Sequence, residues 1–558
     1  MLLNTRSIAI VGGGPRSLAL LQQLVLRAKW HSNTKIWVTV FDPCRDLGCG
    51  RVYTVDQSPH LRMNIQMQEF SVFSEEFRSS YPLQAKTFQQ WCNLNNESYS
   101  QAVPSRSLVG RYLHYAASQV LSLAGRNLNI EHVRSEVTDV RKVEDGYTLE
   151  TSVAHFKFDY LAVVTGHQGW SKSGKQTDGS LMVYPVLENL SKKSIPAGSL
   201  VRVSGMSLTA FDAIIELTEG RGGTFTTNKD GTLFYSSKGE EPEKIVLQSR
   251  SGKLILPKAV FKASQKKRVN EHINSGVARL KAYIDDCERR YLSAEFSLIE
   301  ELFFATASNV ASTLHGAFVD TELWLHSVWQ FESFDFTHRV GQALCLKDYT
   351  LLDAAAAAGL GSTLQSMQPI INKVSDFGGF AHQQRLDYKI FNKILEPIAF
   401  GAIALTAEKI YCLIDKKLVV HASDERELTD QKMTLMDESQ PMPVARVKAF
   451  LPSPGYPHSG EVLRSLINQG VASVDSATKA VRTNSIGCAL SANDKAQVSL
   501  GIFGRVTEHW FTGADSLKAC NSNCIHSWVI AVMTDIGEYA YENPNAETAA
   551  ESQLVQAL

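Results

Sequence analysis

The sequence IAIVGGGPRS at residues 8–17 decides the fold of this chain. Its four apolar residues form a continuous run, as expected of a central parallel strand covered on both faces. Gly12 permits a tight turn, and Gly14 allows a phosphate to approach the backbone with no Cβ in the way. Ser17 stands where a third glycine is usual and is still small enough for close helix–strand packing. The free N–H groups of the helix that follows favour an anion, so this stretch predicts a turn that binds the pyrophosphate of a dinucleotide.

A carboxylate is placed to complete this first nucleotide site. A second strand is predicted over residues 36–41 and ends at Asp42. Asp42 can accept hydrogen bonds from an adenosine ribose and would repel a 2′-phosphate. Its separation from Gly14 exceeds the usual spacing of about 20 residues, and residues 29–34 are expected to form the loop that takes up the difference. The residues expected to contact the first nucleotide are Gly12, Gly13, Gly14, Pro15, Arg16, Ser17 and Asp42.

A weaker turn of the same kind follows a predicted strand at residues 201–204. Gly205 is the one glycine that remains in the pattern, and Ser207 is a small substitute for another. A further strand is predicted over residues 244–248, and Arg250 follows it where the first site has a carboxylate. Because a guanidinium pairs well with a 2′-phosphate, this residue favours NADPH over NADH. The residues expected to contact NADPH are Gly205, Ser207, Leu208, Thr209 and Arg250.

The composition argues against several classes of protein. Of the 558 residues, 44% are hydrophobic and 20% are charged, which provides for buried cores and is unlike a disordered chain. The formal net charge of −1, with no long basic block, argues against a nucleic-acid or membrane partner. The apolar stretch at 397–413 is interrupted by Glu408 and Lys409 and is a poor bilayer span. No signal-peptide pattern is present, and nine scattered cysteines suit reduced thiols, so a cytoplasmic protein is expected.

Further short motifs follow one another along the chain. They are Phe41-Asp42-Pro43, Gly48-x-Gly50, Met63-Asn64, Arg106 with Gly110-Arg111-Tyr112, Thr165-Gly166-His167, residues 205–212, and Phe503-Gly504 with Thr507-Glu508. Together with the first turn, and in this order, they resemble the bacterial FAD–NAD(P)-binding family. That family includes flavin monooxygenases that hydroxylate the amine of an amino acid, such as the aspartate N-hydroxylases that form nitrosuccinate. The resemblance covers most of the chain, although the central helices match only in the spacing of their apolar residues.

The resemblance implies where a flavin lies in this protein. Thr165 and Gly166, at the end of a strand, would pass close to the flavin, and Gly504 would close over its ring. Asn64 would lie beside the ring, and an Asx turn is an equally good interpretation of this residue. The further residues that the resemblance implies for cofactor binding are Gly50, Arg111 and Thr507.

The predicted fold class is α/β, with two Rossmann-like dinucleotide-binding domains and a helical insertion. Apolar residues at three- and four-residue spacing predict helices over residues 277–291, 298–314 and 398–414. Strand-like runs are found at residues 159–164 and 498–503. The predicted segments are 1–195 for the first part of the FAD-binding domain, 196–257 for the NADPH-binding domain, 258–443 for a helical substrate or cover region, and 444–558 for a return segment that completes the FAD-binding domain.

The resemblance implies a function. The family's activity would make the protein an FAD-dependent, NADPH-consuming monooxygenase that hydroxylates the amine of a small amino acid or related amine with O₂, through an oxygenated flavin. Two dinucleotide sites suit this chemistry because NADPH can pass a hydride to FAD. Two alternatives stay open: a flavin oxidoreductase that inserts no oxygen, and a non-catalytic FAD-binding redox sensor. A homo-oligomer is compatible with the sequence.

No catalytic acid or base can be assigned from the sequence, and no metal-binding motif is found. His60, His114 and His167 are candidates for proton transfer, although a structural role is more common for a lone histidine. Cys44 and Cys49 have the spacing of the redox dithiol of flavin disulfide reductases, but the residues around them do not match. A redox pair at Cys44 and Cys49 is therefore not the preferred interpretation. Cys520 and Cys524 fit no zinc or redox motif, and lone buried thiols are preferred there.

Overall fold

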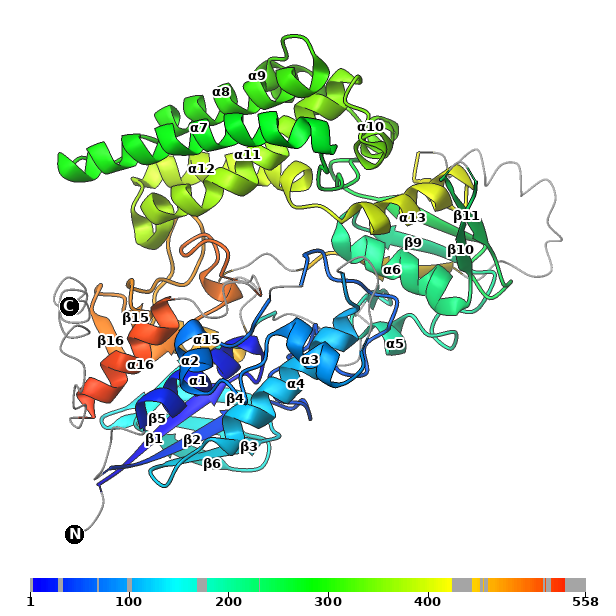
Figure 1. The fold of residues 1–558 in the computed structure, drawn as a ribbon. Coiled ribbons are helices and arrows are strands. Elements are labelled where there is room, and N and C mark those ends of the chain that lie inside the picture. The colour runs from blue at the N-terminus through cyan, green and yellow to red at the C-terminus, as the bar shows by residue number, and fades with distance from the viewer. Residues whose placement is uncertain are drawn as a thin grey trace.

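The computed structural model describes residues 4–28, 34–67, 70–97, 103–167, 178–229, 231–423, 444–451, 455, 460–514, 517 and 523–536. These residues form two α/β units and a layer of helices (Figure 1). The first unit lies at the lower left of Figure 1, the second at the right, and the helical layer at the top. Most of the predicted loop over residues 29–34 lies outside the described residues.

The first unit is built on a six-stranded sheet in the order β15-β16-β7-β1-β2-β3. All neighbouring strands are parallel except β15 and β16. Because β16 pairs with β7, a late segment of the chain joins the sheet that contains β1. The strands are β1 (Asn4–Val11), β2 (Thr34–Phe41), β3 (Leu128–Val133), β7 (Tyr160–Val163), β15 (Cys488–Leu490) and β16 (Ala496–Ile502).

Both faces of β1 are buried, which explains its continuous apolar run. Ile8 and Ile10 join a hydrophobic core with helices on one face, while Ala9 and Val11 join a second core on the other. The helices of the unit are α1 (Pro15–Ala28), α2 (Glu75–Ser80), α3 (Phe88–Leu94), α4 (Arg106–Ser122), α15 (Glu461–Asn468) and α16 (Asn523–Asp535). An antiparallel sheet of β4 (Val137–Val143), β5 (Gly146–Thr151) and β6 (His155–Phe158) contributes with α15 to the second core.

The second unit is built on a five-stranded parallel sheet in the order β13-β12-β9-β14-β8. Its strands are β8 (Leu181–Met182), β9 (Leu200–Ser204), β12 (Lys244–Gln248), β13 (Val419–His421) and β14 (Val444–Lys448). The other elements are α5 (Val186–Asn189), α6 (Leu208–Thr218), η2 (Glu219–Arg221), α13 (Ala404–Asp415) and the hairpin of β10 (Thr224–Thr227) and β11 (Leu233–Ser236).

This sheet differs from the predicted segment boundaries. β8 was assigned to the first segment, β13 to the helical region and β14 to the return segment, yet all three pair within the second unit. The reason is that the pairing of parallel strands is decided by tertiary contacts, which the composition of a segment does not reveal.

The helical layer follows the second unit in sequence and returns to it. Its elements are α7 (Ala263–Arg289), α8 (Phe296–His315), α9 (Thr321–Trp324), η3 (Leu325–Trp329), α10 (Phe334–Leu346), α11 (Leu352–Ser375), η4 (Asp376–Gly378) and α12 (His382–Ala399). The alanine run of α11 is buried, and a Cβ on Gly359 would lie 2.5 Å from the carbonyl oxygen of Ala307. Small residues therefore let α11 and α8 pack closely.

The prediction of one helix over residues 398–414 is wrong, because α12 ends at Ala399 and α13 begins at Ala404. Gly401 lies in the break, where an added Cβ would be 1.5 Å from the carbonyl oxygen of Leu256. Within the described residues no single helix is long and apolar enough to cross a membrane. The pair α12–α13 meets that criterion together, with a bend of 77°. The predicted fold class, with two Rossmann-like sheets and a helical insertion, is confirmed.

Candidate functional site

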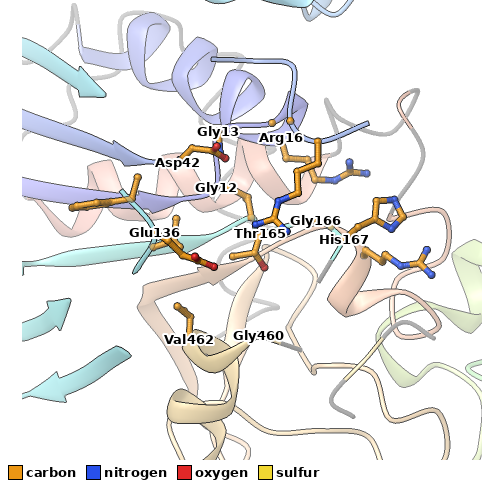
Figure 2. Close-up of a pocket in the computed structure, with 18 of the residues that line it drawn as sticks. Gly12, Gly13, Arg16, Asp42, Glu136, Thr165, Gly166, His167, Gly460 and Val462 are labelled. Atoms are coloured by element: carbon orange, nitrogen blue, oxygen red, sulfur yellow. The ribbon is translucent and has the colours of Figure 1, made fainter. Parts of the chain in front are cut away.

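A cavity of about 550 Å³ opens where the first turn leaves the six-stranded sheet (Figure 2). It lies at the carboxyl ends of β1, β2 and β7, which is where parallel α/β sheets bind their ligands. Residues from both ends of the chain line it. The predicted site residues that line this cavity are Gly12, Gly13, Gly14, Pro15, Arg16, Asp42, Gly50, Thr165, Gly166 and Gly504.

The turn depends on glycine at its first position. Gly12 has a φ of +113°, and its N–H donates to the carbonyl oxygen of Phe41 over 2.9 Å. An added Cβ would lie 2.5 Å from the carbonyl oxygen of Val164. Both the backbone conformation and the close approach to the neighbouring strand therefore exclude a side chain.

Asp42 holds the turn through its carboxylate. One oxygen accepts the N–H of Gly13 over 2.6 Å, and the other accepts the N–H of Cys44 over 2.7 Å. A carboxylate can accept more than one hydrogen bond at each oxygen. Asp42 can therefore brace the turn and still receive the hydroxyl groups of a ribose.

The wall opposite Asp42 was missed by the sequence analysis. It includes Glu136, in the connection between β3 and β4, and the start of α15 at Gly460 and Val462 (Figure 2). α15 is held against β4 by Ser465, whose hydroxyl donates to Asp139 over 2.6 Å. Neither segment carries a nucleotide-binding motif, so only the tertiary structure brings them to the cavity.

The other end of the cavity is formed by two turns. Thr165, Gly166 and His167 follow β7, and His167 lies away from Asp42 at the far end of the view in Figure 2. Gly166 has a φ of +63°, and an added Cβ would meet nothing within 4 Å. Gly504 follows β16 with a φ of +91°, and its added Cβ would be 3.0 Å from the Cδ of Arg16. Because Gly166 and Gly504 have no side chains, their backbone leaves room for a flat ring at this end of the cavity.

Four predicted residues do not line this cavity. Ser17 is buried in α1 and donates to the carbonyl oxygen of Gly14 over 2.6 Å, so it serves helix packing. Thr507, in η6 (Arg505–Thr507), donates its hydroxyl to the carbonyl oxygen of Gly504 over 2.8 Å and supports that turn. Arg111 forms an ion pair with Glu97 at 2.8 Å on the surface of α4.

Asn64 lines a small cleft between the two α/β units. Its backbone carbonyl accepts a hydrogen bond from the Nζ of Lys258 over 2.6 Å. The placement of Asn64 and Arg111 differs from the prediction because short motifs do not fix the direction in which a side chain points.

The second turn repeats the backbone geometry of the first. Gly205 has a φ of +131°, and its N–H donates to the carbonyl oxygen of Gln248 over 2.8 Å. An added Cβ would lie 2.4 Å from the carbonyl oxygen of Ala449. Ser207 precedes α6, whose first residues are Leu208 and Thr209, and Leu208 lines the cleft between the units.

The N–H groups in the first turn of α6 can bind an anion. Arg250 is exposed beyond the end of β12. The predicted residues of this turn thus lie around the carboxyl end of the central strand of the second sheet.

The two thiols near Asp42 do not form a reactive pair. Burial and the neighbouring carboxylate of Asp42 raise the pKa of Cys44 to about 12, and burial raises the pKa of Cys49 as well. Reactive thiols have lowered pKa values. Each cysteine that the structure describes is a free thiol.

The chemistry of the first cavity suits a dinucleotide. A helix N-terminus with glycine-rich backbone can hold a pyrophosphate, and the carboxylates of Asp42 and Glu136 can accept ribose or base donors.

The three histidines named as candidates for proton transfer lie in different surroundings. His167 lines the cavity, whereas His60 lies 3.9 Å from Glu219 and His114 lies 3.8 Å from Asp46.

Comparison with known proteins agrees with this geometry. Residues 9–168 match the family described as FAD-NAD(P)-binding. The nitrosuccinic acid synthase of Aspergillus oryzae is 26% identical over 266 residues, which are 44% of this chain and 40% of that protein. The nitrosuccinate-forming L-aspartate N-monooxygenase of Streptomyces davaonensis is 23% identical over 295 residues, which are 45% of this chain and 44% of that protein. The chain thus spans less than half the length of these curated relatives.

Among solved structures, the ornithine N-hydroxylase of Kutzneria sp. 744 is similar over 96% of this chain and 100% of that chain, with a TM-score of 0.47 and 10% sequence identity. The family match itself contains the first turn, Asp42 and Thr165-Gly166, which together make up much of the cavity. Residues 9–168 are therefore the part of this chain that is similar to the FAD-NAD(P)-binding family.

Proposed function

We propose that this protein is an FAD- and NADPH-dependent monooxygenase that hydroxylates the amine of a small amino acid. The observation that carries the proposal is the presence in one chain of two turns with the same backbone geometry, each at the carboxyl end of a strand that pairs in parallel with both neighbours. One turn opens into a cavity large enough for much of a dinucleotide. The reaction is R–NH₂ + O₂ + NADPH + H⁺ → R–NHOH + H₂O + NADP⁺. One oxygen atom forms the N–O bond, and the other leaves as water.

We assign FAD to the first cavity. The N–H groups of α1 and its glycine turn bind the pyrophosphate, Asp42 receives the adenosine ribose, and the backbone at Gly166 and Gly504 borders the ring. When bound, FAD supplies the redox chemistry that carries two electrons from NADPH to O₂. The protein's own contribution is to bind and orient the cofactor and to exclude water.

We assign NADPH to the second turn. The start of α6 binds its pyrophosphate, and Arg250 pairs with the 2′-phosphate. Residues 196–257 supply this site. The strands β8, β13 and β14 complete the sheet that carries it.

The substrate we propose to test first is L-aspartate. Two relatives are named as aspartate N-monooxygenase and nitrosuccinic acid synthase. Four arginines line the first cavity together with Asp42, Glu136 and Glu461, and Arg505 directly follows Gly504 at the expected ring end. A carboxylate on the substrate would find cationic partners there. The four are Arg16, Arg51, Arg464 and Arg505.

We propose that the helical layer covers the site. η4 contacts the segment after Gly504: the N–H of Phe377 donates to the carbonyl oxygen of Trp510 over 2.7 Å, and its ring stacks on Phe511 with 5.4 Å between centroids. Phe377 also lines a small hollow with Gly504. Exchange of the helical layer for that of a relative should change substrate selectivity, and unchanged selectivity would refute this role.

We further propose that the protein acts on small molecules without a nucleic-acid or membrane partner, in the reducing cytoplasm. The free thiols support the reducing compartment. Its assembly into a homo-oligomer is a separate proposal, which light scattering on the purified protein tests.

The deciding experiment measures NADPH oxidation and hydroxylated product together. With L-aspartate, we expect NADPH oxidation to rise above its basal rate and to yield about one N-hydroxylated product per NADPH in the first turnover. L-Asparagine, which lacks the side-chain charge, is the matched control. Peroxide as the main product with every amine would favour an oxidoreductase without oxygen insertion. A protein that retains FAD but does not oxidise NADPH would instead be a flavin-binding sensor.

A further inference from the structure

Three polar side chains join the two α/β units inside the protein. Arg106 is the first residue of α4 in the first unit, Asp212 lies one turn into α6 in the second, and Tyr184 follows β8. All three are largely buried: the side chains of Arg106 and Asp212 are 12% and 10% exposed, and Tyr184 is 6% exposed. Arg106 and Asp212 both belong to motifs of the family resemblance, and the function proposed above uses neither.

The contacts among these three side chains are directional. The guanidinium of Arg106 approaches both carboxylate oxygens of Asp212, with Nη1–Oδ2 at 2.7 Å and Nη2–Oδ1 at 3.0 Å. The hydroxyl of Tyr184 accepts a hydrogen bond from Arg106 and donates to Oδ2 of Asp212 over 2.5 Å. The Nε of Arg106 donates to the carbonyl oxygen of Arg62 over 3.3 Å. Because the guanidinium is planar and binds both carboxylate oxygens, it fixes the relative orientation of Arg106 and Asp212 as well as their distance.

The same contacts reach the segment 60–64, which belongs to the first unit but enters the second. Leu61 is buried in the hydrophobic core of the second unit, and its carbonyl oxygen accepts the N–H of Arg106 over 2.8 Å. Lys258 donates to the carbonyl oxygen of Asn64 nearby. The ion pair therefore lies within the contact between the units, and it includes Asp212 of α6.

A buried ion pair by itself adds little to the net free energy of folding. Taking two charges out of water costs about as much as their attraction returns, and apolar residues of similar size are often as stable. What the pair gives is a fixed relative orientation of α4 and α6. Asp212 is only four residues after Leu208, where α6 begins and where the pyrophosphate of NADPH is proposed to bind.

We propose that Arg106, Tyr184 and Asp212 are positioning residues that hold the NADPH-binding unit in the orientation needed for hydride transfer to FAD. This inference rests on the proposed function. The transfer moves one hydrogen with two electrons from NADPH to FAD, so the two reacting rings must meet within a narrow range of distance and angle. Loss of the pair lets α6 shift, which slows flavin reduction while NADPH still binds.

The test compares Asp212→Asn and Tyr184→Phe with the double variant Arg106→Met/Asp212→Leu. Flavin reduction is followed after anaerobic mixing of the FAD-loaded protein with NADPH. For Asp212→Asn we expect the limiting rate of reduction to fall at least about tenfold, with the dissociation constant for NADPH changed by less than about threefold. Tyr184→Phe keeps the ion pair and should have a smaller effect.

The double variant separates positioning from structural support. Its apolar side chains should restore part of the unfolding temperature that Asp212→Asn loses, although the Tyr184 hydroxyl is left buried without these two partners. The limiting rate of flavin reduction should stay low. A double variant that recovers both stability and rate would overturn the proposal. So would a loss of NADPH affinity as the main effect of Asp212→Asn.

The matched control is Glu240→Gln, which removes a carboxylate from an exposed ion pair with Lys192 inside the second unit. It should change neither stability nor rate. Amide hydrogen exchange gives a readout that does not depend on the reaction: Asp212→Asn should raise exchange at residues 60–64 and 208–215, and Glu240→Gln should not. If the wild-type flavin is not reduced by NADPH, the proposed function fails. The exchange result then still decides whether the pair fixes the two units, and unchanged exchange would refute it.

Discussion

The first and second turns have the same hydrogen-bond pattern, residue for residue. In the first, Gly12 donates to the carbonyl of Phe41, and Val164 donates to the carbonyl of Val11. In the second, Gly205 donates to the carbonyl of Gln248, and Ala449 donates to the carbonyl of Ser204. In both, a Cβ on the glycine would overlap the carbonyl of the neighbouring strand, at 2.5 Å and 2.4 Å. One glycine at the end of the central strand is therefore enough to build this turn.

The turns differ in the residues that follow. After Gly12, Gly13 donates its N–H to the carboxylate of Asp42, whereas Met206 follows Gly205 and is itself buried. After β12, the residue that corresponds to Asp42 is Ser249, and Arg250 lies one residue beyond the position predicted for it. The hydroxyl of Ser249 accepts the N–H of Gly252 over 3.0 Å. The shared backbone suits a pyrophosphate in both sites. The side chain after the second strand distinguishes a site that excludes a 2′-phosphate from one that can receive it.

We expect the largest effect when Gly12 or Gly205 is replaced by alanine, which adds a methyl group to the turn. Gly12→Ala places a Cβ against Val164 in a backbone conformation that costs about 1–3 kcal/mol for a side chain, and we expect the purified protein to lose FAD. Gly205→Ala should keep FAD and lose reduction by NADPH. Flavin content and anaerobic reduction measure the two outcomes. Gly125→Ala, where an added Cβ meets nothing within 4 Å, is the control. If Gly205→Ala were reduced by NADPH at the wild-type rate, the second turn would not depend on glycine as the first turn does.

A second prediction concerns Asp376 of η4, which bonds to the segment after Gly504. Burial raises the pKa of Asp376 from 3.8 to about 7, against the hydrogen bond that it accepts from the N–H of Thr512 over 2.9 Å. Because the folded pKa is the higher one, its contribution to stability is complete below pH 4 and is lost as the pH rises from about 4 to 7.

Asp376→Asn keeps an acceptor for Thr512 and carries no charge. We expect this variant to gain on the order of 2–4 kcal/mol over wild type at pH 8 and little at pH 4. Denaturant unfolding at the two pH values measures the difference. A gain that is equal at both would show that the carboxyl group does not titrate in this range.

The third prediction concerns the contribution of the Asp42 carboxylate to FAD binding. Asp42→Ala removes both the acceptor for the backbone N–H of Gly13 and the expected partner of the ribose, so we expect FAD affinity to fall about tenfold to a hundredfold. Asp42→Asn keeps one acceptor oxygen and should be intermediate. Titration of the apoprotein with FAD measures the affinities. Asp46→Asn, on a carboxylate that does not line the cavity, is the control. Full FAD affinity in Asp42→Ala would remove the ribose assignment.

The smallest expected effect is that of Arg250→Ala in the second site. We expect the KM for NADPH to rise about tenfold, since a charge-assisted contact to the 2′-phosphate is lost. The KM for NADH should stay nearly unchanged, which makes NADH the internal control. Equal changes with both nucleotides would mean that the second turn does not recognise a 2′-phosphate.

The amino-acid sequence predicts those parts of the protein that depend on neighbouring residues in the chain. A buried strand, a glycine turn and a helix are adjacent in the chain, so residues 8–17 predict the first turn, and the chain around Gly205 predicts the second. Asp42 was found because it directly follows a strand. Residues 498–503 and the motif at Gly504 also predict a return of the chain to the first domain, and in the structure β16 pairs with β7.

Only the tertiary structure decided which distant segments meet. Glu136 and α15 form a wall of the first cavity, and β8, β13 and β14 join the second sheet, because strand pairing and helix packing bring them there. Asn64 and Arg111 lie outside the cavity for the same reason: a motif names a residue but does not fix where its side chain points. The pair of Arg106 and Asp212 was also invisible in the sequence, since 106 positions separate its two halves. Local patterns act within a few residues of the chain, whereas burial and charge pairing act through space.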